Sequence, residues 1–314
     1  MPLPHLTDAD LEALALAPAT IRDALAETLR AQARAHVHSA PKSMLAPKDG
    51  RLLLTTLAAD DETGILAVKS LVQNPANAAR GLPSVGALVT AINAQTGAPI
   101  ATLDGNWITA ARTAALSMLA AQFLARDDAQ TVGFLGSGVQ ASSHLTALAA
   151  LYPLRSIVIH ARSAPTRLLA QAKALGLSAS TVDSPRAAIS HADIVISAMS
   201  RDHAAPDTLD ADWLAPGAFA SFVDLGHNWA RPSFATLDIL ALDDLTQERA
   251  MTPETRLAPL DAFHGDLPAL LSGTCPARQS AAQRTGFLFR GPATADLSLT
   301  ALALKAAGLT PSPS

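Results

Sequence analysis

The sequence predicts an α/β protein with two domains. Its 314 residues exceed the size at which a single hydrophobic core usually stops growing, so two domains are expected. Hydrophobic residues make up 49% of the chain but aromatic residues only 4%, which favours helices packed on a sheet over an aromatic-rich β-sandwich. From Thr131 onward, strand-like runs, glycine turns and helical segments alternate, as a parallel sheet with crossover helices requires.

Charge and cysteine content exclude several classes of protein. The formal net charge is −4 with no long run of one sign, so neither nucleic acid nor an anionic membrane is expected as a partner. The single cysteine, Cys275, allows no intrachain disulfide and no cysteine-based zinc site, and its neighbours do not suggest a nucleophile. The first residues lack a signal-peptide pattern, and the apolar stretch 114–125 is too short to span a bilayer. We expect a cytoplasmic protein without a metal site, since His36, His38 and the other histidines lack metal-ligand spacing.

Helices and then strands are predicted in the N-terminal part. Apolar residues recur at helical spacing from Thr7 to Arg34, with Thr7 as a cap and Pro18 as the point where one helix would divide into two. Short apolar runs between turn residues predict strands at 51–56, 64–69, 87–92 and 99–103. A helix at about 109–125 is followed by strands at 131–135, 156–160, 193–198, 219–223 and 239–242, and the tail after Leu309 is expected to be disordered.

A glycine-rich loop, Gly136-Ser137-Gly138-Val139-Gln140-Ala141, follows a predicted strand and opens the amphipathic segment 139–151. In this context Gly136 permits a tight turn, Gly138 lets the backbone approach a pyrophosphate, and Ala141 permits close packing of helix on strand. The N–H groups at the start of the helix then face the phosphates. The loop predicts a Rossmann domain that binds a nicotinamide dinucleotide, with an ordinary glycine turn as the alternative.

The end of the second strand bears on the choice of cofactor. NAD-selective sites usually place an acid about 20 residues after the glycines, to bind the ribose 2′-hydroxyl. Here the strand ends His160-Ala161-Arg162-Ser163, with no acid. Arg162, with Arg167 nearby, could pair with a 2′-phosphate, so we favour NADP over NAD. The alternative is that both arginines are solvated surface residues.

A longer set of motifs resembles the ornithine cyclodeaminase/mu-crystallin family. The resemblance continues beyond the glycine loop and covers most of the chain. It is carried by Gly81-Leu82-Pro83, Thr96-Gly97, Leu103-Asp104-Gly105, Ile108-Thr109-Ala110-Ala111-Arg112-Thr113-Ala114-Ala115, Arg162-Ser163, Ala192-Asp193-Ile194-Val195, Pro216-Gly217-Ala218 and Gly291-x-Ala293-x-x-Asp296.

The resemblance implies a domain arrangement and a class of reaction. A substrate and dimerisation domain of α+β type, residues 1–117, would be rejoined by the C-terminal helix in 297–314, with the Rossmann domain at 118–296 between them. A homodimer is implied, as is hydride transfer at the α-carbon of a small amino or imino acid. Beyond the loop residues Gly136 to Gln140 and Arg162, the cofactor would contact Thr113, Ser163 and Ala198.

The resemblance also assigns Lys69 as an active-site lysine and Arg112 as the arginine that grips the substrate carboxylate. A guanidinium can bind a carboxylate bidentately, and its charge does not titrate away. Lys69, at the end of a predicted strand, would have its pKa lowered by partial desolvation and could then donate a proton near neutral pH. The alternatives are a structural ion pair for Arg112 and a solvated strand end for Lys69. Lys42 and Ser84 are further candidates for substrate binding.

Two departures from the family pattern bear on the reaction. Where cyclodeaminases carry a substrate-binding arginine after an early proline, this chain has Lys42, which keeps the charge but loses the planar fork. Where they place a catalytic aspartate, ungapped counting reaches Gly226. Asp224 or His227 could supply that group, the alternative being a capping or solvent-facing role for each.

The resemblance and these residues together suggest three functions. The first is NAD(P)H-dependent reduction of a small cyclic imino acid, which needs only a hydride donor, a carboxylate clamp and one acid. The second is ornithine cyclodeamination to proline and ammonia with NAD, which also needs a base for the substrate amine. The third is a dinucleotide-dependent binding protein with little turnover. The residues present meet the requirements of imine reduction.

Overall fold

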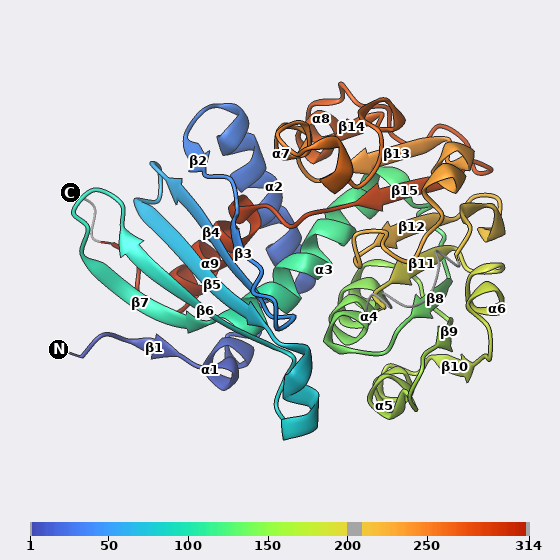
Figure 1. The fold of residues 1–314 in the computed structure, drawn as a ribbon, viewed down its shortest axis with the longest axis horizontal. Helices are drawn as coiled ribbons and strands as arrows, with labels where there is room; N and C mark the ends of the chain where they lie inside the picture. Colours follow the sequence, from blue (N-terminus) through green and yellow to red (C-terminus); the bar gives the residue numbers. More distant parts are fainter. Residues whose placement is uncertain (1, 200–208, 312–314) are drawn as a thin grey trace. The chain divides into compact units, whose positions relative to one another are not determined.

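The computed structural model describes residues 2–199 and 209–311 and divides into two compact units (Figure 1). The first unit comprises residues 1–112 and 291–314, and the second comprises residues 113–290. Of the tail expected to be disordered, residues 312–314 lie outside the described residues.

The first unit is built on a seven-stranded sheet with the order β1-β7-β6-β5-β4-β2, and β3 also pairs with β4. All of these pairings are antiparallel except that of β1 with β7. The strands are β1 (His5–Leu6), β2 (Val37–Ser39), β3 (Ser43–Leu45), β4 (Leu52–Asp60), β5 (Ile65–Gln73), β6 (Val85–Asn93) and β7 (Pro99–Asp104).

Helices from both ends of the chain cover one face of this sheet. Thr7 caps α1 (Asp8–Ala13) in a capping box with Asp10, and α2 (Pro18–Ala33) begins at a proline, so the predicted cap and the division at Pro18 are confirmed. The C-terminal helix α9 (Ala293–Ala306) packs against α2, β4 and β5 (Figure 1). The short helix η1 (Pro75–Arg80) connects β5 to β6.

The second unit is a parallel sheet of eight strands in the order β10-β9-β8-β11-β12-β15-β13-β14 (Figure 1). Its first strand, β8, pairs with both β9 and β11, so the strand order reverses at β8. Ligands of such sheets bind beyond the carboxyl ends of the strands at this reversal. The strands are β8 (Thr131–Leu135), β9 (Ser156–His160), β10 (Ser178–Thr181), β11 (Ile194–Ser197), β12 (Phe219–Phe222), β13 (Ile239–Leu242), β14 (Gly265–Asp266) and β15 (Thr285–Leu288).

Helices and short 3₁₀ turns connect these strands. A longer helix, α3 (Gly105–Leu124), runs from the first unit into the second, where the apolar stretch 114–125 is buried except at Gln122 and Phe123. The other helices are α4 (Val139–Leu151), α5 (Thr166–Ala174), α6 (Pro185–Ile189), α7 (Leu245–Arg249) and α8 (Leu267–Ser272), with 3₁₀ turns η2 (Ala211–Trp213), η3 (Arg231–Thr236), η4 (Pro253–Thr255) and η5 (Leu260–Ala262).

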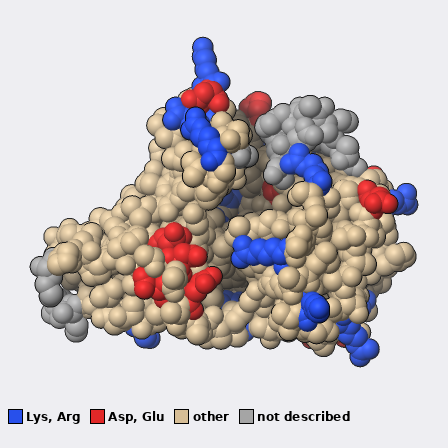
Figure 2. All heavy atoms as spheres, turned by 90° about the horizontal axis from the view of Figure 1, so that it is seen from below, with Lys and Arg blue, Asp and Glu red and all other residues tan. Residues whose placement is uncertain are grey.

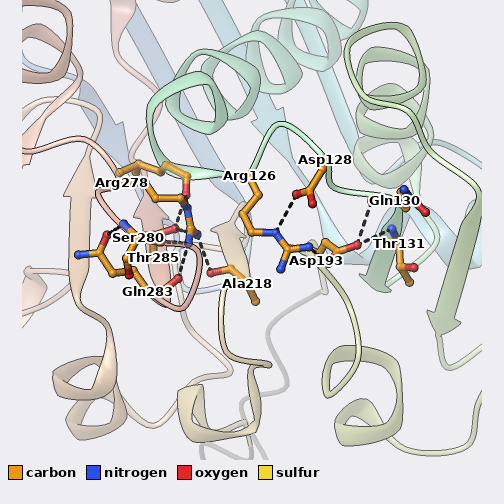
Figure 3. Close-up of polar contacts among 11 residues, drawn as sticks. Arg126, Asp128, Gln130, Thr131, Asp193, Ala218, Arg278, Ser280, Gln283 and Thr285 are labelled. Carbon is orange, nitrogen blue, oxygen red and sulfur yellow. Dashed lines mark hydrogen bonds and ion pairs between the residues drawn. The ribbon is translucent and has the colours of Figure 1, made fainter.

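Two arginines tie together the amino ends of the parallel strands (Figure 3). Arg126 donates to Asp193 over 2.9 Å, and the same carboxylate accepts the backbone N–H groups of Gln130 and Thr131. Arg278 donates to five oxygens, among them the Leu124 and Ala218 carbonyls and the Thr285 hydroxyl. These contacts fix the sheet edge opposite the glycine loop.

Cys275 is buried beside α8 in the second unit. A Cβ built on Gly265 would lie 2.7 Å from its sulfur, so glycine is required opposite the thiol. Burial, with the nearby charge of Asp266, raises the pKa of Cys275 to about 11. The thiol is therefore protonated at neutral pH, in keeping with its expected lack of a nucleophilic role.

The predicted elements match the parallel sheet better than the antiparallel one. The bounds predicted for β8, β9 and β13 are those observed, whereas β4 and β5 each extend well beyond the predicted runs. Lys69 therefore lies in the middle of β5, not at a strand end as expected.

Within the described residues, no helix is long and apolar enough to cross a membrane. Lys and Arg side chains are scattered over the face shown in Figure 2.

Candidate functional site

The glycine loop has the geometry that its sequence predicts. Gly136 has φ +97°, and a Cβ there would lie 2.7 Å from the carbonyl oxygen of Ala198, so only glycine fits this turn. Gly138 caps the start of α4 with φ −78°, and a Cβ built on it would meet nothing within 4 Å. Ala141 is fully buried against the sheet. The space in front of Gly138 is therefore open to a ligand.

The start of α4 has unsatisfied polar groups that suit a phosphate ligand. The N-cap residue Gly138 has no side chain, so no cap side chain accepts a hydrogen bond from the free N–H groups of the first turn. The Gln140 Oε1 atom is buried and has no hydrogen-bond partner among the described residues. Unsatisfied donors and an unsatisfied acceptor at one helix start fit a bound dinucleotide, which offers phosphate oxygens and hydroxyls.

Three of the other predicted cofactor residues lie on the same edge of the sheet. Arg162 and Ser163 follow β9 and are exposed, and Ala198 follows β11. Backbone hydrogen bonds join these segments to the loop, since Gly136 donates to His160 and Ala198 donates to Leu135. Thr113, on α3, is 3% exposed.

A buried hydrogen-bonded chain supports the first turn of α4. His144 Nδ1 lies 2.7 Å from the Gln140 carbonyl oxygen, so this nitrogen carries the proton. Its Nε2 then accepts from the Ser117 hydroxyl over 2.8 Å, and Ser117 lies 2.8 Å from Ser221 on β12. Burial lowers the pKa of His144 to about 4, so the ring is neutral at physiological pH. The sequence pattern gave no signal for this chain.

The first unit contains a buried cluster of four polar side chains from four elements. Lys69 of β5 donates to Asp296 of α9 over 2.5 Å, and Thr56 of β4 donates to the other carboxylate oxygen over 2.8 Å. Arg112 of α3 lies with Nε 3.2 Å from Asp296, an ion pair without hydrogen-bond geometry. Lys69, Asp296 and Arg112 are at most 9% exposed. The structure thus brings together the two residues predicted to act on substrate.

The register of the sheet explains how this cluster forms. Thr56 is the direct partner of Lys69 across β4 and β5, so both side chains lie on the face that α9 covers. Asp296 lies in the first turn of α9, where the helix dipole favours a carboxylate. Gly291, just before α9, adopts φ +75° and leaves room for the guanidinium of Arg112.

Burial and charge set the protonation of this cluster. Burial and the charge of Arg112 lower the pKa of Lys69 to about 8, although the charge and hydrogen bond of Asp296 act to raise it. Burial would raise the pKa of Asp296, but Lys69, Arg112 and the hydrogen bond from Thr56 hold it below its ordinary value. Lys69 is therefore a cation that can lose a proton near neutral pH, beside a permanent carboxylate.

Asp296 was not predicted to be a functional residue, and its only mark in the sequence is that it ends a family motif.

Lys42 and Ser84, which were predicted to bind substrate, are not among the four residues of the cluster. Lys42 is half-buried between β2 and β3, next to Ser43, which pairs with Thr55. Ser84 is exposed before β6. It lies roughly 17 Å along the strand from Val89, the residue that pairs with Lys69.

Asp224 lies in the second unit, in the turn after β12. Its carboxylate accepts from the Ser197 hydroxyl over 2.7 Å, from Asn228 over 3.3 Å and from the backbone N–H of Gly226 over 3.2 Å. Burial raises its pKa to about 6 against the effect of these hydrogen bonds. Gly226 has φ +65° and a Cβ there would crowd Leu288, so glycine belongs to the turn itself. Half-buried His227 follows it.

The parallel sheet with its reversal at β8, and the glycine loop at that point, define a Rossmann-type enzyme that uses NAD(P). The model of the ornithine cyclodeaminase/mu-crystallin family matches residues 6–305. The chain belongs to this family.

Relatives are similar to the chain in sequence, and a solved structure shares its fold. An uncharacterized cyclodeaminase of Sinorhizobium fredii is 31% identical over 72% of each chain. A Delta(1)-pyrroline-2-carboxylate/Delta(1)-piperideine-2-carboxylate reductase of Azospirillum brasilense is 32% identical over 52% of this chain and 51% of its own. The structure of Thermococcus litoralis Delta(1)-pyrroline-2-carboxylate reductase, in complex with NADH and L-proline, superposes with a TM-score of 0.86, at 23% identity, over 99% of this chain and all of that one.

Proposed function

We propose that this enzyme reduces a small cyclic imino acid, such as a pyrroline- or piperideine-2-carboxylate, with NAD(P)H. The observation that carries the proposal is the buried cluster of Lys69, Arg112 and Asp296. Two cations and one carboxylate leave an excess of one positive charge in a desolvated site. That excess matches the single carboxylate of an imino acid.

The same charge count disfavours ornithine. At neutral pH ornithine brings two ammonium groups with its carboxylate, so its binding would add a further positive charge to a site that already carries one. Buried like charges repel strongly, and an unpaired buried charge is costly. A cyclodeaminase site therefore needs a second carboxylate near the substrate amines.

Asp224 is a poor candidate for that second carboxylate. Its oxygens are occupied by Ser197, Asn228 and the Gly226 N–H, all within its own unit. This arrangement supports a role in holding the turn after β12, one of the two roles expected from the sequence. Ornithine cyclodeamination stays the alternative function, and it would require a base for the substrate amine.

In the proposed reaction each residue of the cluster has one task. Arg112 binds the substrate carboxylate through the nitrogens that Asp296 leaves open, which orients the imine carbon. The reduced nicotinamide, when bound, supplies the hydride to that carbon. Lys69 gives a proton to the imine nitrogen, and its pKa of about 8 suits such a donor near neutral pH.

The test is a substrate screen with purified protein. Oxidation of NADPH or NADH is followed with pyrroline-2-carboxylate and piperideine-2-carboxylate, and ammonia release is followed with ornithine and catalytic NAD. We expect stoichiometric cofactor oxidation with a cyclic imine and little ammonia from ornithine. Rapid ammonia and proline formation from ornithine would contradict the proposal and would favour Asp224 as the base. Neither reaction with any substrate would favour a binding protein.

A Lys69→Met variant tests the role of the lysine. We expect kcat to fall by roughly 10²–10⁴-fold with a smaller change in KM, the range for loss of a general acid. Lys305→Met is the matched control, because Lys305 is exposed in the last turn of α9. An unchanged kcat in Lys69→Met would remove Lys69 from the mechanism.

We also propose a cytoplasmic homodimer in which a second copy covers the outer face of the β3–β6 strands. Register places Leu45, Leu57, Val72 and Leu88 on the face opposite Lys69, and each is 39–67% exposed. Exposed apolar groups that share one sheet face are typical of a subunit interface. Light scattering should give twice the chain mass, and Leu57→Lys should shift it toward the monomer. A monomeric wild-type protein would contradict the homodimer.

A further inference from the structure

We propose that Asp296 is a positioning residue that keeps Lys69 protonated and aims its ammonium group, so that Lys69 can deliver a proton to the substrate nitrogen. The inference deepens the proposed imine reduction and rests on it for the identity of the proton acceptor. The link between Asp296 and the protonation of Lys69 stands on the structure of the first unit alone.

The carboxylate of Asp296 is oriented from two neighbouring strands. Oδ1 accepts from the Lys69 ammonium over 2.5 Å and Oδ2 accepts from the Thr56 hydroxyl over 2.8 Å. Because Thr56 and Lys69 pair directly across β4 and β5, neighbouring strands supply the donors that hold the two carboxylate oxygens. The ammonium thereby has a fixed position and two remaining N–H groups.

The groups that face Lys69 leave Asp296 as its principal source of negative charge. Its strand partners, Thr56 on β4 and Val89 on β6, are uncharged. Arg112 from α3 acts against the protonated lysine, and burial acts in the same direction. Among these influences, Asp296 alone favours the ammonium form. Without its charge, both remaining effects favour a neutral amine that has no proton to give.

The proton step balances as follows. When hydride adds to the imine carbon, the π electron pair of the C=N bond moves to nitrogen, which forms a new N–H bond with a proton from Lys69. The product is a cyclic amino acid, the nicotinamide is oxidised, and Lys69 becomes a neutral amine that takes a proton from water. Asp296 stays a carboxylate throughout and does not touch the substrate.

The primary experiment measures the titration of Lys69 in the full-length protein without substrate. The ¹⁵N signal of the Lys69 side chain, assigned by its loss in Lys69→Met, is followed against pH in the wild type and in Asp296→Asn. Asparagine keeps the size and an oxygen for Thr56 but removes the charge. We expect a midpoint near 8 in the wild type, and a midpoint lower by at least about one unit in Asp296→Asn, the scale of a nearby opposite charge.

Kinetics give the second measurement and separate the role of Asp296 from the proposed imine reduction. In the wild type, kcat for imine reduction should decrease as the pH rises through about 8. In Asp296→Asn this decrease should occur at lower pH. Thr56→Val leaves the charge of Asp296 in place and should not change the pH of the decrease. Asp296→Glu should restore much of the wild-type profile.

Each outcome is decisive. The same midpoint in folded Asp296→Asn as in the wild type would overturn the inference even if imines are reduced. A shifted midpoint in a protein that reduces no imine would uphold the coupling of the two residues and reject the proposed function. If Asp296→Asn fails to fold, the titration of Asp296→Ser, which also removes the charge, decides the matter in the same way.

Discussion

Gly291 lies directly against the guanidinium of Arg112. A methyl group built on Gly291 would lie 2.4 Å from Nη1 and 2.9 Å from Nη2 of the arginine, and Gly291 has φ +75°. We expect Gly291→Ala to displace Arg112 and to lower kcat/KM for the imine by at least about tenfold, since one well-aligned charge-assisted hydrogen bond is worth 1.5–3 kcal/mol. Gly308→Ala is the matched control, because Gly308 has φ +69° and nothing within 4 Å of its Cβ. Equal losses in both variants would mean that backbone strain, not the arginine, is responsible.

Arg112→Lys keeps the positive charge and removes the planar fork. We expect a loss of about 1.5–3 kcal/mol in kcat/KM, roughly 10- to 150-fold, because a lysine cannot bind the carboxylate bidentately. Steady-state kinetics with the imine measure it. Arg51→Lys, at an exposed ion pair with Asp49, should have no effect. Full activity in Arg112→Lys would rule out bidentate binding.

Gly138→Val should abolish binding of the dinucleotide and leave the protein folded. The position has φ −78° and open space at its Cβ, so valine fits the backbone but fills the place of the ligand. Calorimetry with NADPH and NADH measures binding, and thermal unfolding checks the fold. Gly86→Val, also at an open Cβ, is the control. Normal binding by Gly138→Val would mean that the loop does not hold the pyrophosphate.

Arg162→Ala should weaken NADPH far more than NADH. Arg162 follows β9 and is exposed, and no acid stands at the end of that strand to repel a 2′-phosphate. Dissociation constants for both cofactors provide the measurement, with Arg167→Ala for comparison. A wild-type preference for NADH, or equal weakening of both cofactors, would reject the preference for NADP.

His144 should make the fold less stable in acid. Its pKa is about 4 in the folded chain and 6.5 when exposed, so the unfolded chain binds more protons below pH 6.5. Its contribution to stability is thus present above pH 6.5 and is lost as the pH falls toward 4, by about 2–3 kcal/mol. Denaturant unfolding of His144→Gln should show a smaller loss between pH 7 and pH 4 than the wild type.

His191→Gln, at an exposed histidine, should follow the wild-type dependence of stability on pH. The comparison with wild type is needed because Asp224, with a raised pKa of about 6, contributes in the opposite sense over the same range. Identical curves for wild type and His144→Gln would show that burial does not lower the pKa of His144.

The parallel sheet and its loop could be predicted from sequence because their signals are local. The strand Thr131–Leu135, the turn at Gly136 and the helix from Val139 follow one another within about twenty residues, and each has its own residue preferences. The strands β4 and β5 were predicted too short, since Thr56 and Lys69 interrupt the apolar pattern while facing inward. A strand is predicted from apolar residues at its inward-facing positions, and a polar residue at such a position breaks that pattern.

The cluster at Lys69 could be predicted only in part. Lys69 and Arg112 were found through motifs, but the role of Asp296 depends on a contact across 227 positions of sequence. No periodicity or local spacing encodes such a contact, because tertiary packing of α9 on β5 creates it. The chain His144-Ser117-Ser221 was missed for the same reason, since its members come from α4, α3 and β12.

The buried thiol of Cys275 makes this protein convenient for site-specific labelling. Cys275 is the sole cysteine of the chain, it is 3% exposed, and its pKa of about 11 keeps it in the unreactive thiol form. A cysteine introduced at an exposed position such as Leu175 would therefore react alone with a maleimide dye. A pair of such positions, one in each unit, would show by energy transfer whether the distance between the units changes when cofactor and substrate bind, with Cys275 left in place.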